Sequence, residues 1–362
     1  IVKRGSTPLN TPARLHQILR WQGGLVLLFL VTSLWSPAQP VSMVRALQLA
    51  IMYMLSVTIL TEWSREGIEQ LWVVLRRLLW LFVVAGVVLT AIVPLWQPFI
   101  VGFAGDVRYR LFAMHPISTG SVLGLALIAL VSTQFGTPDP WFSRPFMRVI
   151  RWGALAGAGG LLVSTGSRGA MVATVVAVGS LIAVSPQRST RRLLAFGVAA
   201  SVLIVAMGVG ASALGELVLR GQNLTQVARL SGRFELAAAA VPLLEDRVLF
   251  GNGYLAARSV FLQLAWGAGE SHNMVLEILF STGLFGLVVL GGFLASLGKG
   301  IFERLPLRLN RPLSRQAVAL FLYPLLNGVV ASGFIAGPGS GLLSMTLAVM
   351  FVLSEPSGRS AT

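Results

Sequence analysis

Three residues of this sequence have side chains whose chemistry stands out from their apolar surroundings. His272 stands beside Asn273 directly before a long apolar run, in a chain with 3 histidines. An imidazole can accept a proton near neutral pH, because its ordinary pKa is about 6.5. Arg168 and Arg233 carry guanidinium groups, which stay charged and can bind an anion through paired hydrogen bonds. What these groups can do together depends on the elements that carry them.

Composition decides the class of protein. Of the 362 residues, 55% are hydrophobic and 11% are charged, and the mean hydropathy is +0.79, values that indicate an integral membrane protein. A bilayer core of about 30 Å needs roughly 20 apolar residues in a helix. We therefore predict an all-α fold, a polytopic bundle of about ten membrane spans. The predicted spans are 20–36, 41–60, 78–96, 116–135, 152–166, 170–185, 193–212, 273–298, 316–334 and 339–354.

The spans divide the chain into three parts. Residues 1–212 are predicted to be transmembrane helices with short loops, 213–271 one large periplasmic loop domain containing helices, and 272–362 further transmembrane helices. The chain begins at Ile1 without a cleavable signal pattern, so we expect that it is trimmed at the front and that more spans precede it. Cysteine is absent, which removes disulfides and thiolate chemistry.

The net charge is +15, and the basic residues lie in the connections between spans rather than in a soluble basic patch. No nucleic-acid partner is therefore expected. Every second connection is basic, which places those loops in the cytoplasm and the remaining loops on the periplasmic face. Arg108, Arg110 and Arg168 then lie in periplasmic connections. An arginine in the tight break at 168 costs about 2.5–3.5 kcal/mol at full membrane depth, which favours a functional role. Interfacial snorkelling is the alternative.

The loop 213–271 and the helix after it are predicted to present His272 on a rigid element. Residues 232–244 have the pattern of an amphipathic helix, and Gly251 and Gly253 would let the backbone approach a ligand or another helix. The loop is expected to lie over the outer membrane face. Gly283 would lie roughly 16 Å below His272 in a continuous helix, near mid-bilayer, where small residues let helices pack closely. Glu277, one turn into this helix, would hydrogen-bond to Asn273 or face a polar cavity.

The pattern His272-Asn273, nine residues, Gly283-Leu-Phe-Gly286 resembles the signature of the O-antigen ligase and O-antigen polymerase superfamily. These are multispanning enzymes with one large periplasmic loop just before this motif. Other parts resemble the superfamily in the same order along the chain. They are Leu34-Trp-Ser-Pro37 leading to Arg45, Ser164-Thr-Gly-Ser-Arg-Gly169, Ser231-Gly-Arg233 and Leu249-Phe-Gly-Asn-Gly253.

The resemblance implies an inverting glycosyltransferase of the bacterial inner membrane with its active site facing the periplasm. Its donor would be an undecaprenyl diphosphate-linked glycan, its acceptor a saccharide or lipid A core, and its surroundings membrane lipids. His272 would be the general base, and Arg168 and Arg233 would bind the diphosphate. Substrate-binding roles are expected for Asn273, Arg110, His115, Arg108, Arg45 and Glu277.

No cofactor and no metal are expected, because the outward carboxylates show no spaced acidic motif. Alternatives stay open for several residues: His272 as a helix cap, His115 as a structural turn before Pro116, and Arg108 and Arg110 as partners of Asp106. The alternative function is a transporter or flippase for polysaccharide precursors, which should show repeated halves with interrupted spans. Ligase, polymerase and protein glycosylation are not separated by these motifs.

Overall fold

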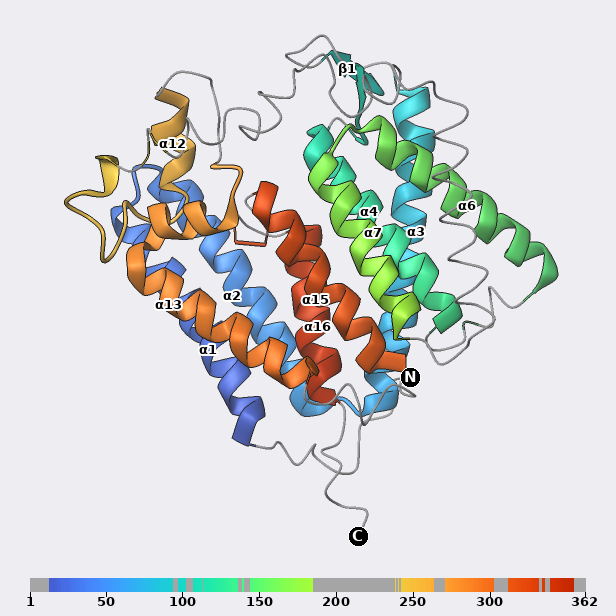
Figure 1. Cartoon of the computed structure of the whole chain (residues 1–362), viewed down its shortest axis with the longest axis horizontal. Helices are drawn as coiled ribbons and strands as arrows, with labels where there is room; N and C mark the ends of the chain where they lie inside the picture. The colour runs from blue at the N-terminus through green and yellow to red at the C-terminus, as the bar shows by residue number, and fades with distance from the viewer. Residues whose placement is uncertain are drawn as a thin grey trace.

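The computed structural model shows a bundle of long helices (Figure 1). It describes residues 13–93, 97–101, 107–112, 114–135, 139, 144–184, 238, 240, 242–263, 271–302, 312–331, 334–335 and 339–354. Arg233 and the predicted span 193–212 lie outside these residues. The long helices are α1 (Ala13–Thr32), α2 (Gln39–Glu62), α3 (Arg65–Ile92), α4 (Pro116–Phe135), α6 (Pro145–Ser164), α7 (Arg168–Ala183), α13 (Met274–Phe302), α15 (Pro312–Val330) and α16 (Ser340–Ser354).

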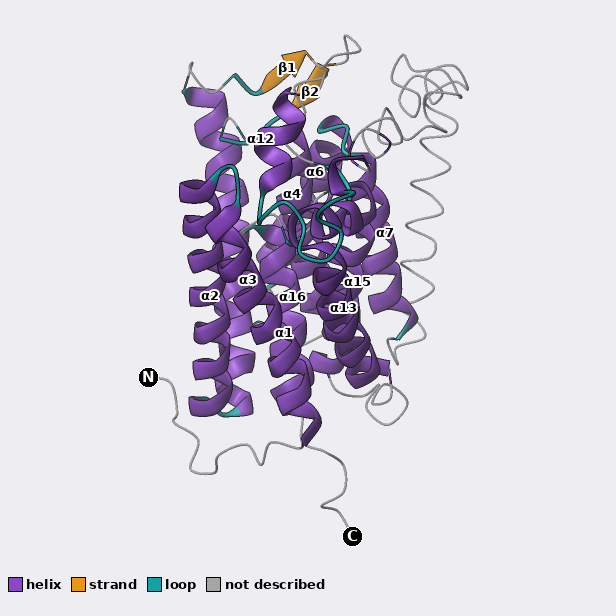
Figure 2. Cartoon of the chain, turned by 90° about the vertical axis from the view of Figure 1, so that its left-hand side faces the viewer, coloured by secondary structure: helices purple, strands orange, loops and turns teal. Residues whose placement is uncertain are grey.

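Six of the described helices, α1 to α4, α6 and α13, are long and apolar enough to cross a membrane. The shorter α7 and α16 are also apolar. Most of these helices run side by side along one direction, as Figure 2 shows from the side. This confirms a multi-pass helical bundle, whereas the predicted number of spans and the predicted periplasmic loop domain remain predictions. The other helical pieces are η1 (Ser33–Trp35), η4 (Pro242–Leu244) and α12 (Ala256–Gln263).

The described residues are mostly helical, as expected, and include in addition one small β-hairpin. Strand β1 (Phe99–Val101) pairs antiparallel with β2 (Val107–Tyr109), with Phe99 opposite Tyr109. The buried Tyr109 joins side chains of α3, α4, α6 and α7 in one hydrophobic cluster. The hairpin therefore lies over the ends of these helices, at the top in Figure 2. Its three-residue strands are too short to give a period-two pattern in an apolar sequence.

Helix α3 begins earlier than the span predicted at 78–96. The hydroxyl of Ser64 caps its first turn, so that Arg76 and Arg77 lie inside the helix rather than in a connecting loop. Arg76 is buried. Arg77 donates two hydrogen bonds to the carboxylate of Asp139, at 3.1 and 2.5 Å. A charged residue inside a membrane helix needs such a partner, which the sequence pattern alone did not supply.

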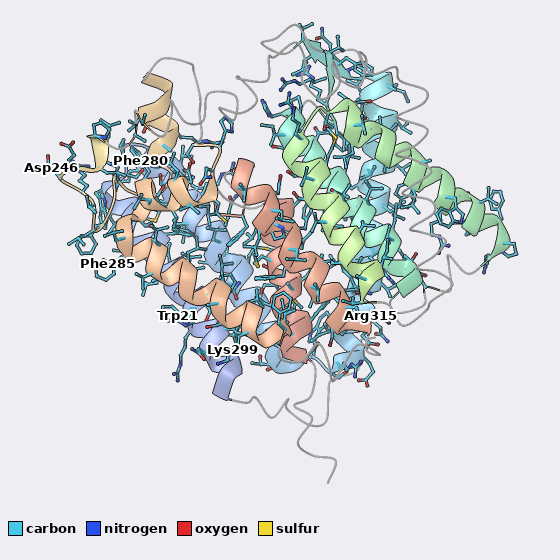
Figure 3. All side chains as sticks on the ribbon, viewed as in Figure 1. Trp21, Asp246, Phe280, Phe285, Lys299 and Arg315 are labelled. Atoms are coloured by element: carbon cyan, nitrogen blue, oxygen red, sulfur yellow. The ribbon has the colours of Figure 1, made fainter. Side chains whose placement is uncertain are left out.

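Labelled side chains mark the two ends of the bundle. Figure 3 shows Lys299 and Arg315 near one end, whereas Phe280 and Asp246 lie toward the other. We call these the basic end, which carries Lys299 and Arg315, and the histidine end, which carries His272. Tight packing at Gly300, where an added Cβ would lie 3.1 Å from Val352 Cγ1, brings the end of α16 to the basic end as well.

Helix α13 is broken at Gly283, whose φ of 66° and ψ of −160° are open essentially to glycine alone. The part before the break lies across the bundle and the part after it descends along the bundle (Figure 1). The expectation of a continuous helix with Gly283 near mid-bilayer is therefore wrong. The apolar run continues through Gly283, so the sequence does not reveal a break whose hydrogen bonds are supplied from elsewhere in the chain.

Those hydrogen bonds come from residues 248–253. The amides of Asn252 and Gly253 donate to the carbonyls of Phe280 and Ser281 at 2.8 and 3.0 Å, and the amides of Leu284 and Phe285 donate to Val248 and Leu249 at 2.9 and 3.3 Å. We call this set of four bonds the backbone clamp. Each unsatisfied backbone group in lipid costs several kcal/mol, so the clamp is what permits the break. Residues 251–257, which include the end of the clamp, are buried within the protein.

Gly283→Ala is expected to destabilise the protein strongly. An added Cβ would lie 2.3 Å from the carbonyl group of Leu249, and the backbone conformation is closed to alanine. Strain and overpacking together predict a loss on the order of 2–6 kcal/mol. Thermal unfolding in detergent measures it. Gly291→Ala, on the same helix with nothing within 4 Å of its added Cβ, is the matched control and should be neutral or slightly stabilising. Equal behaviour of the two variants would contradict the clamp.

Candidate active site

His272 occupies a strained turn directly before α13. Its φ is 54°, in the left-handed region that few residues other than glycine adopt. The side chain is half-buried. Such strain costs about 1–3 kcal/mol, survives only where the surroundings hold it, and is concentrated at functional sites. The contacts of the two flanking residues show what holds the imidazole in place.

Glu277 holds the turn from inside the protein. Its Oε2 accepts hydrogen bonds from the Ser271 amide at 3.1 Å and from the Ser271 hydroxyl at 2.7 Å. Both residues are almost completely buried. Ser271 is a partner that the sequence did not reveal. These bonds favour a positioning role for Glu277 in the turn of His272, and its predicted contact with substrate stays a prediction.

Asn273 joins α13 to α15. Its Oδ1 accepts a hydrogen bond from the Leu276 amide at 3.0 Å, which caps the start of α13. Its Nδ2 donates to the Val329 carbonyl at the end of α15, also at 3.0 Å. Both ends of the amide are thus used within the protein. This favours a positioning role over the predicted substrate contact.

Arg168 is the first residue of α7. A tight turn precedes it, in which Gly166 has φ 66° and the amide of Ser167 donates to the Thr165 hydroxyl at 3.1 Å. No acidic residue follows in the first turn of α7. The positive electrostatic potential at the N-terminus of α7 therefore adds to that of the Arg168 guanidinium. The combined potential favours the binding of an anion at this position.

Helices α4 and α15 bring the turn before Arg168 to the histidine end. An added Cβ on Gly120 of α4 would lie 2.7 Å from Ser167, so the two elements are in close contact. The neighbouring Ser121 accepts a hydrogen bond from Asn327 of α15 at 2.9 Å. Since the end of α15 also binds Asn273, a short series of contacts links Arg168 to the turn of His272. The structure thus places both residues at the same end of the bundle.

Residues 153–291 match the model of the O-antigen ligase family. The resemblance to the O-antigen ligase and polymerase superfamily is confirmed. The matched segment contains both Arg168 and His272, together with the clamp and Gly283. It supports a glycosyltransferase of the ligase or polymerase type. A comparison with curated proteins found no match.

The O-antigen ligase match also includes Arg233, which lies outside the described residues. Its predicted role stays a prediction. The helix predicted at 232–244 lies mostly outside them too, and its described end, Pro242–Leu244, is a 3-10 turn.

Arg108 and Arg110, which precede the O-antigen ligase match, belong to the hairpin region. Arg108 stands in β2 opposite Ile100. Arg110 donates its Nε hydrogen to the Gln97 carbonyl at 2.7 Å and is half-buried. Asp106, their expected partner, lies outside the described residues. The hairpin places both arginines above α4 and α6, near the helix ends that include Arg168.

His115 stands at the start of α4. Its Nδ1 accepts a hydrogen bond from the Ile117 amide at 3.3 Å, and its carbonyl accepts one from Thr119 at 2.9 Å. These bonds agree with the alternative of a structural turn before Pro116. The ring is exposed, so a contact with substrate stays a prediction.

Arg45 lies about one turn after Ser42 of α2, whose hydroxyl donates to the carbonyl of Tyr254 at 2.6 Å. Burial raises the pKa of Tyr254 well above its ordinary value, nearby Glu277 raises it further, and Arg45 and Arg258 lower it. The hydroxyl of Tyr254 donates to the Ile335 carbonyl at 2.9 Å. Sequence reasoning did not single out Tyr254, although its place directly after Gly-Asn-Gly was an available signal.

The described residues contain no group of three or more His, Asp or Glu side chains that could hold a metal ion. The expectation of metal-independent chemistry stays a prediction, since several of the outward carboxylates lie outside those residues.

The positioning role of Glu277 is open to a direct test. Glu277→Gln keeps an oxygen that can accept the Ser271 hydrogen bonds, whereas Glu277→Ala removes it. We expect the alanine variant to lose about 10²-fold in kcat, because a misplaced catalytic group costs that much, and the glutamine variant to keep most of its rate. KM should change little in both. If glutamine is as damaging as alanine, the carboxylate charge itself is used and the positioning role is wrong.

Proposed function

We propose that this protein moves a saccharide from undecaprenyl diphosphate to an acceptor hydroxyl at the periplasmic face of the bacterial inner membrane. The observation that carries the proposal is the placement of His272 and Arg168 at one end of a multi-pass bundle. The family match supports the class of reaction, with a lipid-linked glycan and an acceptor as substrates.

His272 acts as the general base. Its imidazole takes the proton of the acceptor hydroxyl while the hydroxyl oxygen forms a bond to the anomeric carbon. The bond from that carbon to the diphosphate oxygen breaks on the opposite face, and the electron pair leaves with the diphosphate. The configuration at the anomeric carbon is thereby inverted. A turn held by Glu277 and Asn273 suits this role, because general-base catalysis needs a fixed distance to the proton.

Arg168 stabilises the departing diphosphate, with Arg233 as its partner. Negative charge grows on the leaving group as the anomeric bond breaks. A guanidinium at a helix N-terminus stabilises that charge without reorganising, which is often the largest contribution to catalysis. Arg45, Arg108, Arg110 and His115 are the further candidates for contact with the substrates.

We infer the orientation from the basic connection between α13 and α15, which runs from Lys299 to Arg315 in the sequence. Lys299 and Arg315 mark the basic end, which the positive-inside rule assigns to the cytoplasm. The histidine end then faces the periplasm, where lipid-linked glycans are transferred without nucleotide sugars.

Purified protein supplied with a lipid diphosphate saccharide and an acceptor tests the proposal. Product should form, its anomeric configuration should be inverted, and His272→Ala should abolish it. Uptake of the saccharide into sealed vesicles without covalent product would instead support the transporter alternative.

The break in α13 bears on that alternative, since transporters also use interrupted helices. In transporters the freed backbone groups bind substrate or ions. Here the backbone clamp takes up four such groups, at Phe280, Ser281, Leu284 and Phe285. This occupation favours an enzyme, whose site is held still, over a transporter.

Deletion in the host separates the remaining possibilities. Loss of chain length with single repeat units retained indicates a polymerase. Long chains left on the carrier lipid indicate a ligase that serves lipid A core, and loss of glycan from protein alone indicates a protein glycosyltransferase.

A further inference from the structure

Helix α15 contains a proline in its interior, Pro324. Proline has no amide hydrogen, so the carbonyl of Leu320, four residues earlier, lacks the donor that a regular α-helix supplies. The hydroxyl of Ser344 in α16 donates to this carbonyl at 2.7 Å, and Ser344 is completely buried. A backbone group freed inside a membrane bundle needs such a partner from a neighbouring helix. Ser344 thus replaces the amide that Pro324 removes.

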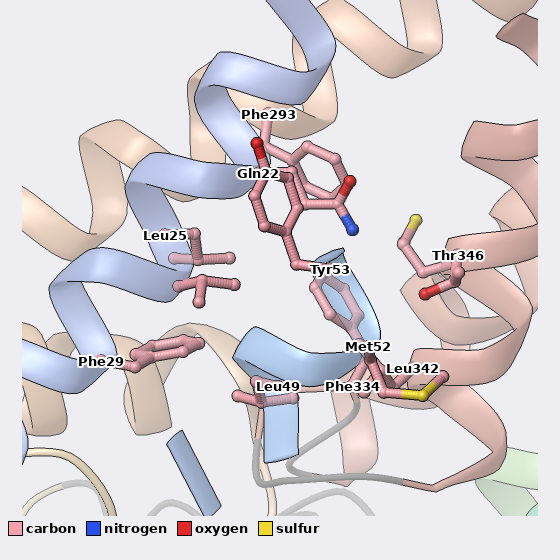
Figure 4. Close-up of a pocket in the computed structure, with 12 residues that line it drawn as sticks. Gln22, Leu25, Phe29, Leu49, Met52, Tyr53, Phe293, Phe334, Leu342 and Thr346 are labelled. Atoms are coloured by element: carbon pink, nitrogen blue, oxygen red, sulfur yellow. The ribbon is translucent and has the colours of Figure 1, made fainter. Parts of the chain in front are cut away.

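Ser344 lies on the side of α16 that faces α15. Leu342 and Thr346, one turn apart on α16, line a cavity shared with α1, α2 and α13 (Figure 4). Two residues turn an α-helix by about 200°, so Ser344 stands on the face opposite both of them. Its hydrogen bond to Leu320 therefore belongs to the packing of α15 on α16 and is separate from that cavity.

The last two turns of α15 bind α4. Tyr323 donates from its hydroxyl to the Ser121 carbonyl at 2.6 Å. Asn327 donates from Nδ2 to the Ser121 hydroxyl at 2.9 Å. The preceding residue of α4, Gly120, packs against the turn that leads to Arg168. These bonds therefore connect α15 to the part of the site that carries the guanidinium.

The same turns of α15 also bind the start of α13. The Val329 carbonyl accepts a hydrogen bond from Asn273 Nδ2 at 3.0 Å, and Asn273 directly follows His272. Residues 323–329, which we call the strut, thus join the helix beside the Arg168 turn to the turn of His272. Since hydrogen bonds fix the strut on both sides, its position sets the separation of the guanidinium and the imidazole.

We propose that Ser344 is a positioning residue for glycan transfer, because its hydroxyl fixes α15 at Leu320, directly before the strut. This inference rests on the proposed function. Without the bond the Leu320 carbonyl would be buried without its donor, and α15 would bend there until water or another group supplied one. The strut would shift with it, and a displacement of about 1 Å at a catalytic site costs about 10²-fold in rate.

Transfer kinetics of the full chain in proteoliposomes test the proposal. Ser344→Ala is expected to lower kcat about 10- to 10²-fold, while KM for a polyprenyl diphosphate-linked saccharide changes little, since the variant disturbs the geometry of the site and not the binding of the donor. Ser354→Ala is the matched control. Ser354 is equally buried in α16 but donates to the Phe351 carbonyl of its own helix, so this variant should transfer like the wild type.

Pro324→Ala separates positioning from a general loss of packing. Alanine restores the amide donor to the Leu320 carbonyl, so Ser344→Ala should lower kcat little in this background. The ratio of kcat between each parent protein and its Ser344→Ala variant is compared with and without Pro324→Ala, so any effect of Pro324→Ala itself cancels. An equal ratio in both backgrounds overturns the proposal.

A structural measurement keeps this inference apart from the proposed function. The chain has no cysteine, so spin labels can be placed on Val163→Cys and Val275→Cys, exposed sites at the end of α6 and the start of α13. Their separation reports the geometry of the site without any substrate. Ser344→Ala should shift or broaden the distance distribution, and Ser354→Ala should not.

The two measurements fail in different ways. If the wild type transfers no saccharide, the proposed function is wrong, whereas the distances still decide whether Ser344 holds the strut. An unchanged distance distribution in Ser344→Ala, or an unchanged kcat, overturns the positioning role.

Discussion

Replacing His272 with asparagine is expected to lower the rate of glycan transfer about 10²- to 10⁴-fold, the contribution usual for a general base. Asparagine adopts the left-handed backbone region more readily than most residues, so the turn at φ 54° should persist. The carboxamide cannot accept the proton of the acceptor hydroxyl. The loss should therefore appear in kcat, with the unfolding temperature close to that of the wild type.

The pH dependence of the transfer rate, compared between the wild type and His272→Asn, is a second test of the general base. The rate of the wild type should fall as the pH is lowered, because a protonated imidazole cannot accept another proton. The residual rate of His272→Asn should lack this dependence. Initial rates across the pH range, with a fixed lipid-linked donor, measure it. A wild-type rate without an acid limb, or a fully active asparagine variant, would show that His272 acts only as a helix cap.

Replacing Arg168 with alanine is expected to lower kcat about 10²- to 10³-fold, since it removes a charge aimed at the leaving diphosphate. Lysine at this position should give an intermediate rate, because an ammonium supplies the charge but not the paired hydrogen bonds. Transfer assays with a lipid diphosphate donor measure both effects. The single-turnover rate is the decisive value, because it reports the step in which the anomeric bond breaks.

The control for this series is Arg144→Ala. Arg144 is an exposed arginine at the start of α6, the helix that leads to the turn before Arg168. It should leave transfer unchanged, so that a general loss of positive charge is separated from the loss of one site. A large effect of Arg144→Ala, or an equal rate for lysine and arginine at 168, would argue against diphosphate binding by the Arg168 guanidinium.

Parts of the site were accessible to prediction because they are local. The apolar runs predicted the described membrane helices, and the sparse charges predicted that Arg168 and His272 share one end of the bundle. Gly251 and Gly253 were expected to bring the backbone close to another element, and added Cβ atoms there would lie 2.6 Å from α13 and 2.5 Å from Ser36. Each of these features follows from residue type and spacing alone.

The other features of the site could not be predicted from the sequence, because they depend on partners that are distant in the chain. Gly283 has the same chemistry whether a helix continues through it or breaks, and the choice rests on hydrogen bonds from residues 248–253. The predicted spans left Arg77 in a connection, whereas α3 includes it and Asp139, distant in the chain, pairs with it. The hydrogen bond between Glu277 and the Ser271 hydroxyl likewise depends on the turn before α13, which residue type and spacing do not specify.

The sequence by itself determined a membrane bundle and the types of side chain available for chemistry, since hydrophobic length and charge act independently of the other elements. Only the tertiary structure decided how His272 is held. Its strained turn depends on bonds from Glu277 and Asn273, on the end of α15, and on the broken helix behind it. A buried backbone or carboxylate group must find a partner somewhere, and which partner it finds is settled by packing rather than by neighbours in sequence.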